Sequence, residues 1–162
     1  MKKQNGLTFV EILMALAILS IVTAISLPSF KSFIDTSSVS SVSSTLISSL
    51  SYARLEAIRR GDFVMISTTG SGSNWSAENR IWLDSNNDNS YDNDDQVLRL
   101  VENSNSNISV SSNGVTTVAF RADGFISTPA TFTICHNDES EGKRIELLIS
   151  GRVSVDENYT CP

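Results

Sequence analysis

An apolar run near the start of the chain limits its fold most strongly. Residues 7–27 read LTFVEILMALAILSIVTAISL and contain one ionisable side chain, Glu11. As a helix rising about 1.5 Å per residue, this run would be roughly 31 Å long, which matches the hydrocarbon core of a bilayer. Lys2 and Lys3 precede it, and the positive-inside rule puts that end in the cytoplasm. We therefore expect a membrane-spanning helix over residues 7–28, with the rest of the chain on the other side.

Two ordinary explanations of this run leave Glu11 unexplained. A secretory signal peptide has a shorter, acid-free apolar region that ends in a small-x-small cleavage site, and residues 25–28 (ISLP) do not form such a site. A plain membrane anchor has no evident use for a carboxylate, which costs about 3 kcal/mol inside a spanning helix. Glu11 is therefore a candidate functional residue that needs a cationic partner.

The start of the chain resembles a type IV pilin or pseudopilin precursor. The resemblance rests on the basic leader MKKQN, on Gly6 and Leu7, and on Glu11 as the fifth residue after Gly6. It implies that residues 1–6 are a leader peptide, that a prepilin peptidase cleaves after Gly6, and that the same enzyme methylates the amino group of Leu7. The freed amino group of a neighbouring Leu7 would then be the cationic partner of Glu11 during assembly.

The segment after the membrane run is rich in serine but carries a helical pattern. Its apolar residues recur at steps of three or four: Val39, Val42, Leu46, Leu50, Ala53 and Ala57. This spacing predicts one apolar stripe along a helix. Arg59, Arg60 and then Gly61 mark the end, because cations and a left-handed glycine favour a helix C-terminus. We expect one helix over residues 7–60, with an amphipathic continuation over residues 29–61.

Beyond Gly61 the chain has short apolar runs separated by Asn, Asp, Ser and Gly clusters, a pattern typical of strands and loops. The expected strands cover residues 63–68, 80–83, 97–101, 108–111, 115–121, 131–136, 144–150 and 152–155. A helix followed by such strands predicts an α+β fold, with the helix stripe laid across one sheet face. Residues 62–162 would form one periplasmic β-rich globular domain.

The globular part is similar to the FimT, FimU and GspH group of minor pilins and pseudopilins. The similarity rests on residues 51–61 (SYARLEAIRRG), 82–88 (WLDxNxD), 97–99 (VLR), 120–124 (FxxxG) and 151–153 (GRV). It implies a pilin-like fold in which a long helix packs on antiparallel β-sheets, and a role at the fibre tip or in the initiating complex. Other minor pilins and the inner-membrane assembly platform are the partners that it implies.

The two cysteines, Cys135 and Cys161, lie in the part of the chain that is placed outside the cytoplasm, where a disulfide persists. We predict one disulfide near the C-terminus. It would close a loop of about 26 residues, worth roughly 3.5 kcal/mol in the chain-entropy model. Two free thiols or a metal pair are the alternatives, and the single histidine, His136, is too little for a zinc site.

Residues 84–95 (DSNNDNSYDNDD), here named the acidic loop, have the spacing of an EF-hand loop. The weak candidate ligands for calcium are Asp84, Asn86, Asp88, Asp92 and Asp95. Two positions depart from that pattern: Asn89 replaces the usual glycine, and Asp95 is shorter than the usual glutamate. A solvated turn is the alternative, because Asn and Asp favour such loops for their own backbone reasons. The sequence indicates no other cofactor.

The formal charge of −6 argues against general nucleic-acid binding, which rests on concentrated Lys and Arg. The DNA-uptake branch of FimT carries a Gly-Arg-x-Arg motif, and Ser154 replaces the second arginine here. Arg152, Lys143 and Arg144 are the remaining candidates for contact with DNA. No nucleophile and base are paired in the sequence, so we expect no enzyme.

These features favour a minor pilin that helps to initiate assembly of a type IV pilus and sits at or near its tip. A GspH-type minor pseudopilin of a type II secretion system is the alternative, and a DNA-binding pilin for DNA uptake is less favoured. We expect a single-pass protein of the bacterial inner membrane, with a cytoplasmic N-terminus and a periplasmic domain, that later enters a pilus or pseudopilus fibre.

Overall fold

A computed structural model describes residues 8–102, 105–137 and 140–162, without the side chains of residues 24–29. The elements follow in the order α1 (Phe9–Arg60), β1 (Val64–Thr68), β2 (Asn79–Leu83), β3 (Gln96–Val101), β4 (Ile108–Ser112), β5 (Thr117–Phe120), β6 (Ala130–His136), β7 (Glu141–Leu147) and β8 (Val153–Thr160). Internal contacts divide the chain into two units, Met1–Ile34 and Asp35–Pro162, and each is described by itself.

Helix α1 begins at a capping box. Thr8 Oγ1 accepts a hydrogen bond from the Glu11 amide at 3.3 Å, and Glu11 Oε2 accepts one from the Thr8 amide at 3.4 Å. Such a reciprocal Thr-x-x-Glu pair satisfies two of the amides that a helix leaves unpaired at its first turn. An acid in this turn also interacts favourably with the helix dipole. Glu11 therefore has a structural task at the start of α1.

The apolar side chains of the first unit, from Phe9 to Val22, are exposed. Within the part of the chain that the structure describes, no helix combines the length and the hydropathy needed to cross a membrane. The span predicted over residues 7–28 includes residue 7 and the side chains of residues 24–28, which lie outside the description. That span stays a prediction.

The stripe predicted on the second half of α1 forms the helix side of the hydrophobic core. Its buried members are Val39, Leu46, Leu50, Ala53 and Ala57, and the partly buried Val42 packs against them. The helix ends as expected, because Gly61 has φ of 70° and its amide donates to Ala57 O at 2.9 Å. Glycine adopts this left-handed conformation without a Cβ clash.

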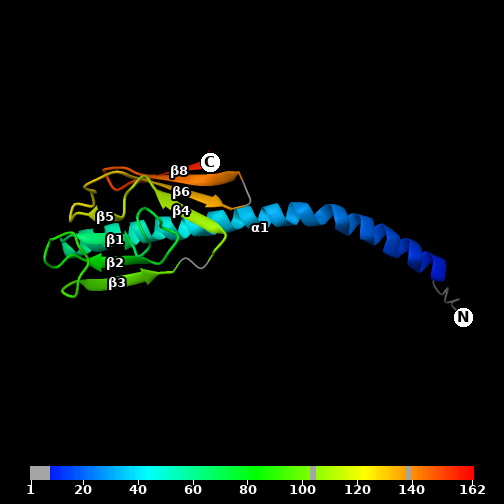
Figure 1. The fold of residues 1–162 in the computed structure, drawn as a ribbon, viewed down its shortest axis with the longest axis horizontal. Helices are drawn as coiled ribbons and strands as arrows, with labels where there is room; N and C mark the ends of the chain where they lie inside the picture. The colour runs from blue at the N-terminus through cyan, green and yellow to red at the C-terminus, as the bar shows by residue number, and fades with distance from the viewer. Residues whose placement is uncertain (1–7, 103–104, 138–139) are drawn as a thin grey trace, which may run out of the picture. The chain divides into compact units, whose positions relative to one another are not determined.

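The eight expected strands are all present, and they form two antiparallel sheets, as the pilin-like fold implied. The antiparallel sheets have the strand orders β3-β2-β1-β5 and β4-β6-β7-β8. The chain passes from β4 in one sheet to β5 in the other through a turn in which Gly114 has φ of 90°. In Figure 1, β6 and β8 lie on one side of the cyan part of α1, and β2 and β3 lie on the other.

The largest change in a strand boundary is at β8, which reaches Thr160 instead of residue 155. The added residues are polar and pair with β7 through backbone hydrogen bonds, from Arg144 opposite Asp156 to Glu141 opposite Thr160. Strand pairing, rather than a run of apolar residues, therefore sets the length of β8.

The core lies among α1 and the inward faces of both sheets. Trp75 and Phe132 are fully buried, with ring centroids 4.9 Å apart in an edge-to-face arrangement. Trp75 Nε1 donates to Val115 O at 2.8 Å, which satisfies the one polar group of the ring. The α+β architecture predicted from the sequence is therefore confirmed.

Candidate functional site

The predicted processing site lies at the edge of the described chain. Gly6 and Leu7 are outside the described residues, so cleavage after Gly6 and methylation of Leu7 stay predictions. Glu11 is described and exposed, and its carboxylate accepts a hydrogen bond from the Thr8 amide. The capping function of Glu11 is not among the sequence predictions, although its signal, a Thr three residues before a Glu at the head of an apolar run, is present.

The predicted disulfide between Cys135 and Cys161 is present. It ties the end of the chain to β6, and the Cys161 amide also donates to Ser140 O at 2.8 Å. Gly142 lies against the bond, because a Cβ at this position would meet Cys161 Sγ and Ile134 O. The last residues of the chain are therefore part of the folded unit.

A buried ionisable pair joins α1 to β6. His136 Nε2 lies 3.4 Å from Asp35 Oδ1, and the two residues are 5 % and 7 % exposed. Asp35 Oδ2 accepts no hydrogen bond from any described residue. Its burial is not among the sequence predictions, although Asp35 lies one helical turn before Val39 on the apolar stripe.

Arg54 on α1 holds two turns of the globular unit together. Its Nε donates to Gly124 O at 3.0 Å, and its Nη2 donates to Ser150 O at 3.1 Å. Gly124 and Gly151 have φ of 78° and 72°. A Cβ on Gly124 would lie 2.8 Å from Ile58 Cδ1, and one on Gly151 would meet Gly124 O, so both positions require glycine. We name these residues (Arg54, Gly124, Ser150 and Gly151) the Arg54 junction.

Glu56 accepts hydrogen bonds from both arginines at the end of α1. Its Oε2 lies 2.6 Å from Arg59 Nη2 and 2.8 Å from Arg60 Nε. These bonds, first from Arg59 and then from Arg60, hold the pKa of the Glu56 carboxyl below its ordinary value of 4.5. The two cations that mark the helix end are therefore engaged with this carboxylate.

The acidic loop folds through hydrogen bonds from its own backbone. Asp84 is 1 % exposed. Its two carboxylate oxygens accept hydrogen bonds from the backbone amides of Asp88 at 3.2 Å and Asn89 at 3.0 Å. Asp95 accepts the amides of Ser85 and Asp92, each at 3.0 Å. Asn89 has φ of 62°, in the left-handed region that its short amide side chain tolerates.

Among the described residues, no group of three or more His, Cys, Asp or Glu side chains is arranged to hold a metal ion. The acidic loop is a turn closed by hydrogen bonds from its own backbone amides. Calcium binding by Asp84, Asn86, Asp88, Asp92 and Asp95 stays a prediction.

The acidic loop also covers the outer face of the sheet that contains β2. Trp82 is 1 % exposed, and its ring meets the Tyr91 ring edge-on at 5.6 Å. The Arg80 guanidinium lies 3.9 Å from the centroid of the Tyr91 ring, in cation–π contact. Tyr91 thus anchors the loop, which shields a second apolar surface beside the main core.

The structure does not gather the candidate DNA-contacting cations into one patch. Lys143 pairs with Glu157, and Arg144 pairs with Asp156 at 3.1 Å. Arg152 follows the turn between β7 and β8 and lies beside the Arg54 junction. Two of the three cations are therefore neutralised locally, which removes support for phosphate binding. DNA binding stays a less favoured prediction.

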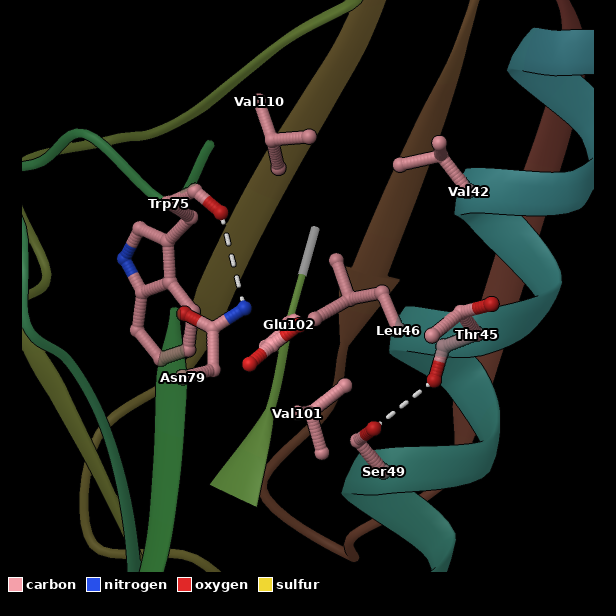
Figure 2. A pocket seen from close by; sticks show the side chains of 9 residues that line it. All are labelled: Val42, Thr45, Leu46, Ser49, Trp75, Asn79, Val101, Glu102 and Val110. Atoms are coloured by element: carbon pink, nitrogen blue, oxygen red, sulfur yellow. Dashed lines mark hydrogen bonds between the residues drawn. The ribbon is translucent and has the colours of Figure 1, made fainter. Parts of the chain in front are cut away.

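A small cavity of about 20 Å³ lies in the core beside α1 (Figure 2). Asn79 lines it, is 6 % exposed and donates Nδ2 to Trp75 O at 3.5 Å. Its Oδ1 accepts no hydrogen bond from any described residue. A cavity of this size has room for about one water molecule, so it is too small to be a substrate site.

The family follows from comparison with known proteins. The family model described as type II transport protein GspH matches residues 43–151, about two thirds of the chain. This chain belongs to the GspH family. A model of the prokaryotic N-terminal methylation motif matches residues 1–27 in addition. Comparison with curated protein sequences gives no significant match.

Solved structures share the fold of this GspH-family chain. Two crystal structures of the type IV minor pilin FimU from Pseudomonas aeruginosa (strain PAO1) give TM-scores of 0.64 and 0.61, each at 22 % identity. The similarity covers 73 % and 72 % of this chain and 87 % and 91 % of the FimU chains. The solution structure of E. coli GspH gives a TM-score of 0.55 at 15 % identity and covers 76 % of this chain and 90 % of that one.

Family membership gives this chain a structural role as a minor subunit of the pilin and pseudopilin type, and it is not an enzyme. The methylation motif implies processing by a prepilin peptidase, and the family implies assembly with other pilins. The same motif is that of proteins anchored in the inner membrane before they enter a fibre.

Proposed function

We propose that this GspH-family subunit is a minor pilin that helps to initiate assembly of a type IV pilus and lies at or near its tip. The observation that carries the proposal is the union, in one chain, of the N-terminal methylation motif with a GspH-family domain through the unbroken helix α1. The higher TM-score with the minor pilin FimU than with GspH favours the pilus.

A minor pseudopilin of a type II secretion system is the second candidate, and the description of the matching family favours it. The two functions predict different phenotypes for a deletion strain. Loss of surface pili and twitching, with normal secretion of exoproteins, supports the pilus. Loss of exoprotein secretion with normal pili contradicts it and supports the second candidate.

The processing site is tested at Gly6. Gly6→Ala should leave uncleaved precursor, visible as slower migration on a gel, because the peptidase cleaves after this residue in the proposed scheme. Asn5→Ala, one residue earlier, is the control and should be cleaved. Normal cleavage of Gly6→Ala would contradict the assigned site.

Glu11 has two separable tasks, and its variants distinguish them. Glu11→Gln keeps a side chain that completes a capping box but removes the charge. We expect this variant to be inserted and cleaved but not incorporated into the fibre, because the pair with the amino group of a neighbouring Leu7 is lost. Thr8→Ala removes part of the capping box, keeps the carboxylate, and should be incorporated. Normal incorporation of Glu11→Gln would assign Glu11 to helix capping alone.

A further inference from the structure

A groove with a volume of about 520 Å³ opens between the end of α1 and the turn that joins β7 to β8. Leu55 and Ile58 on the helix form one wall, and Gly151 and Arg152 form the other. Arg54 extends across the floor of the groove to Ser150 O. Gly124 and Gly151 have no side chains there, which leaves room for the Arg54 side chain.

Exposed apolar side chains gather around this groove. Leu55 is 65 % exposed and Ile58 47 %, and three more apolar residues on the neighbouring turns are also exposed: Phe125, Leu148 and Ile149. The Ile126 amide donates to Ile149 O at 2.9 Å, which places the turn that holds Phe125 beside the turn that holds Ile149. Exposed apolar side chains on the groove wall and on the two turns beside it are typical of an interaction surface.

The shape of the groove is fixed before anything binds. Arg54 joins α1 to both turns, and Gly124 and Gly151 pack against it in a conformation that other residues adopt only with strain. A surface that is already ordered loses little conformational entropy on binding, so more of its contact energy contributes to affinity.

The two charged side chains that line the groove, Arg54 and Arg152, are both cationic, and the acid on the turn beside it, Asp123, pairs with Arg121 at 2.9 Å. Arg152 is exposed and forms no ion pair within the described ranges, and Arg54 contributes a second guanidinium. Of the residues that the structure describes, no Asp or Glu lines the groove. The nearest acid on α1, Glu56, is held by Arg59 and Arg60. An occupant that carries a carboxylate beside apolar side chains therefore complements this surface.

Nucleic acid fits the groove poorly. A phosphate backbone would meet one unpaired cation, Arg152, next to the bare apolar side chains of Leu55 and Ile58. Affinity for DNA depends on several phosphate contacts made together. An apolar protein side chain that covered Leu55 and Ile58 would instead contribute favourable binding free energy by burying apolar surface.

We propose that this groove is a docking site for an acidic, apolar segment of a second pilin-type subunit, with Arg152 bound to a carboxylate and the helix wall covered by a large apolar side chain. The inference rests on the proposed function, since that function supplies other pilin-type subunits as neighbours.

The test is site-specific photo-crosslinking of the full-length chain in the producing cells. The probe is p-benzoylphenylalanine, placed in separate variants at Leu55 and at Ile149, with Leu100 on β3 as the control because it is 52 % exposed and far from the groove in the strand order. We expect crosslinks from Leu55 in the groove and from Ile149 on the turn beside it to a peptide of another subunit that bears a prepilin motif, with an Asp or Glu beside apolar residues. If the variant protein with the probe at Leu55 does not accumulate in the cells, the probe is placed at Ile58 instead. Leu148 replaces Ile149 in the same way.

Charge reversal is the second arm of the test. Arg152→Glu should reduce the crosslink yield from Leu55 by roughly tenfold, whereas Arg99→Glu on β3 should leave it unchanged. Crosslinks to nucleic acid or lipid, or equal yields from Leu100, overturn the docking site. An absence of crosslinks from both Leu55 and Ile149, in a strain whose pili depend on this gene, also overturns the docking site. That result leaves the proposed function standing. A deletion that affects neither pili nor secretion overturns both proposals.

Discussion

His136 Nε2 on β6 lies 3.4 Å from Asp35 Oδ1 on α1, at the point where the globular unit begins. Both side chains are buried, so each loses most of its hydration on folding. The attraction between such partners offsets the cost of desolvation only while both are present. The pair therefore fixes the position of α1 against β6 more than it adds to the free energy of unfolding.

His136→Leu should lower the free energy of unfolding by about 3 kcal/mol, because Asp35 would be left buried without its partner. Asp35→Leu combined with His136→Leu should recover part of this loss. Thermal denaturation of the purified full-length chain in mild detergent would measure both effects. With Asp35→Leu alone as the third variant, a loss in the double variant equal to the sum of the two single losses would show that the pair is not coupled.

Glu56 should make stability depend on pH in the acid range. Because its pKa in the folded protein is below the ordinary value of 4.5, the stabilisation is present above that value and is lost as the pH falls through the folded pKa. Wild type should therefore be more stable than Glu56→Gln at neutral pH, and the gap should shrink below pH 4.5. A gap that is constant with pH would contradict this origin.

Gly151→Ala should be more destabilising than Gly61→Ala. Both residues have positive φ, but a Cβ has open space at Gly61 and meets backbone and Arg54 at Gly151. The shared backbone strain costs about 1 kcal/mol, and the clash at Gly151 adds about 2 kcal/mol. Denaturant unfolding of the two variants would separate the contributions, and equal losses would count against the packing of the Arg54 junction.

Replacing both Cys135 and Cys161 with serine should lower the free energy of unfolding by roughly 3.5 kcal/mol, the value expected for a loop of about 26 residues. A reductant should lower the melting temperature of wild type and leave the double variant unchanged. A wild-type melting temperature insensitive to reductant would contradict a structural role for the bond.

Asp84→Ala should release the acidic loop, because the amides of Asp88 and Asn89 lose their acceptor. Tyr91 would then leave Trp82, and the tryptophan emission should shift to longer wavelength. Asp94→Ala is the control, since Asp94 is exposed. We expect the same melting temperature for wild type in calcium and in EDTA, and a higher value in calcium would instead support the candidate calcium ligands.

Much of the fold could be predicted from the sequence because its signals are local. The apolar stripe of α1, the cap at Gly61 and the eight strands each depend on residues within one turn or one run. The division into two sheets could not be predicted in this way. It depends on which strands pair across the chain, and β4 and β5 are neighbours in sequence but lie in different sheets.

The features of the candidate site also differ in whether they depend on local signals or on contacts between distant residues. The disulfide was predictable because the chain holds only two cysteines, whereas the contacts of Arg54 join residues 70 and 96 positions apart. The pair of His136 and Asp35 is likewise distant in sequence. In the acidic loop, the spacing of the carboxylates could be seen in the sequence. The hydrogen bonds that Asp84 accepts from the amides of Asp88 and Asn89 could not.

The Arg54 junction has a consequence for the order of events in the cell. It joins Arg54 on the helix to Ser150, a turn residue near the end of the chain. Because the chain is made from its N-terminus onward, this contact is among the last that is able to form. The groove beside it exists only once residue 151 is in place. A subunit that is truncated, or still being exported, would lack this surface. A neighbouring subunit that binds at the groove would therefore bind only completely folded domains, and only these would enter the fibre.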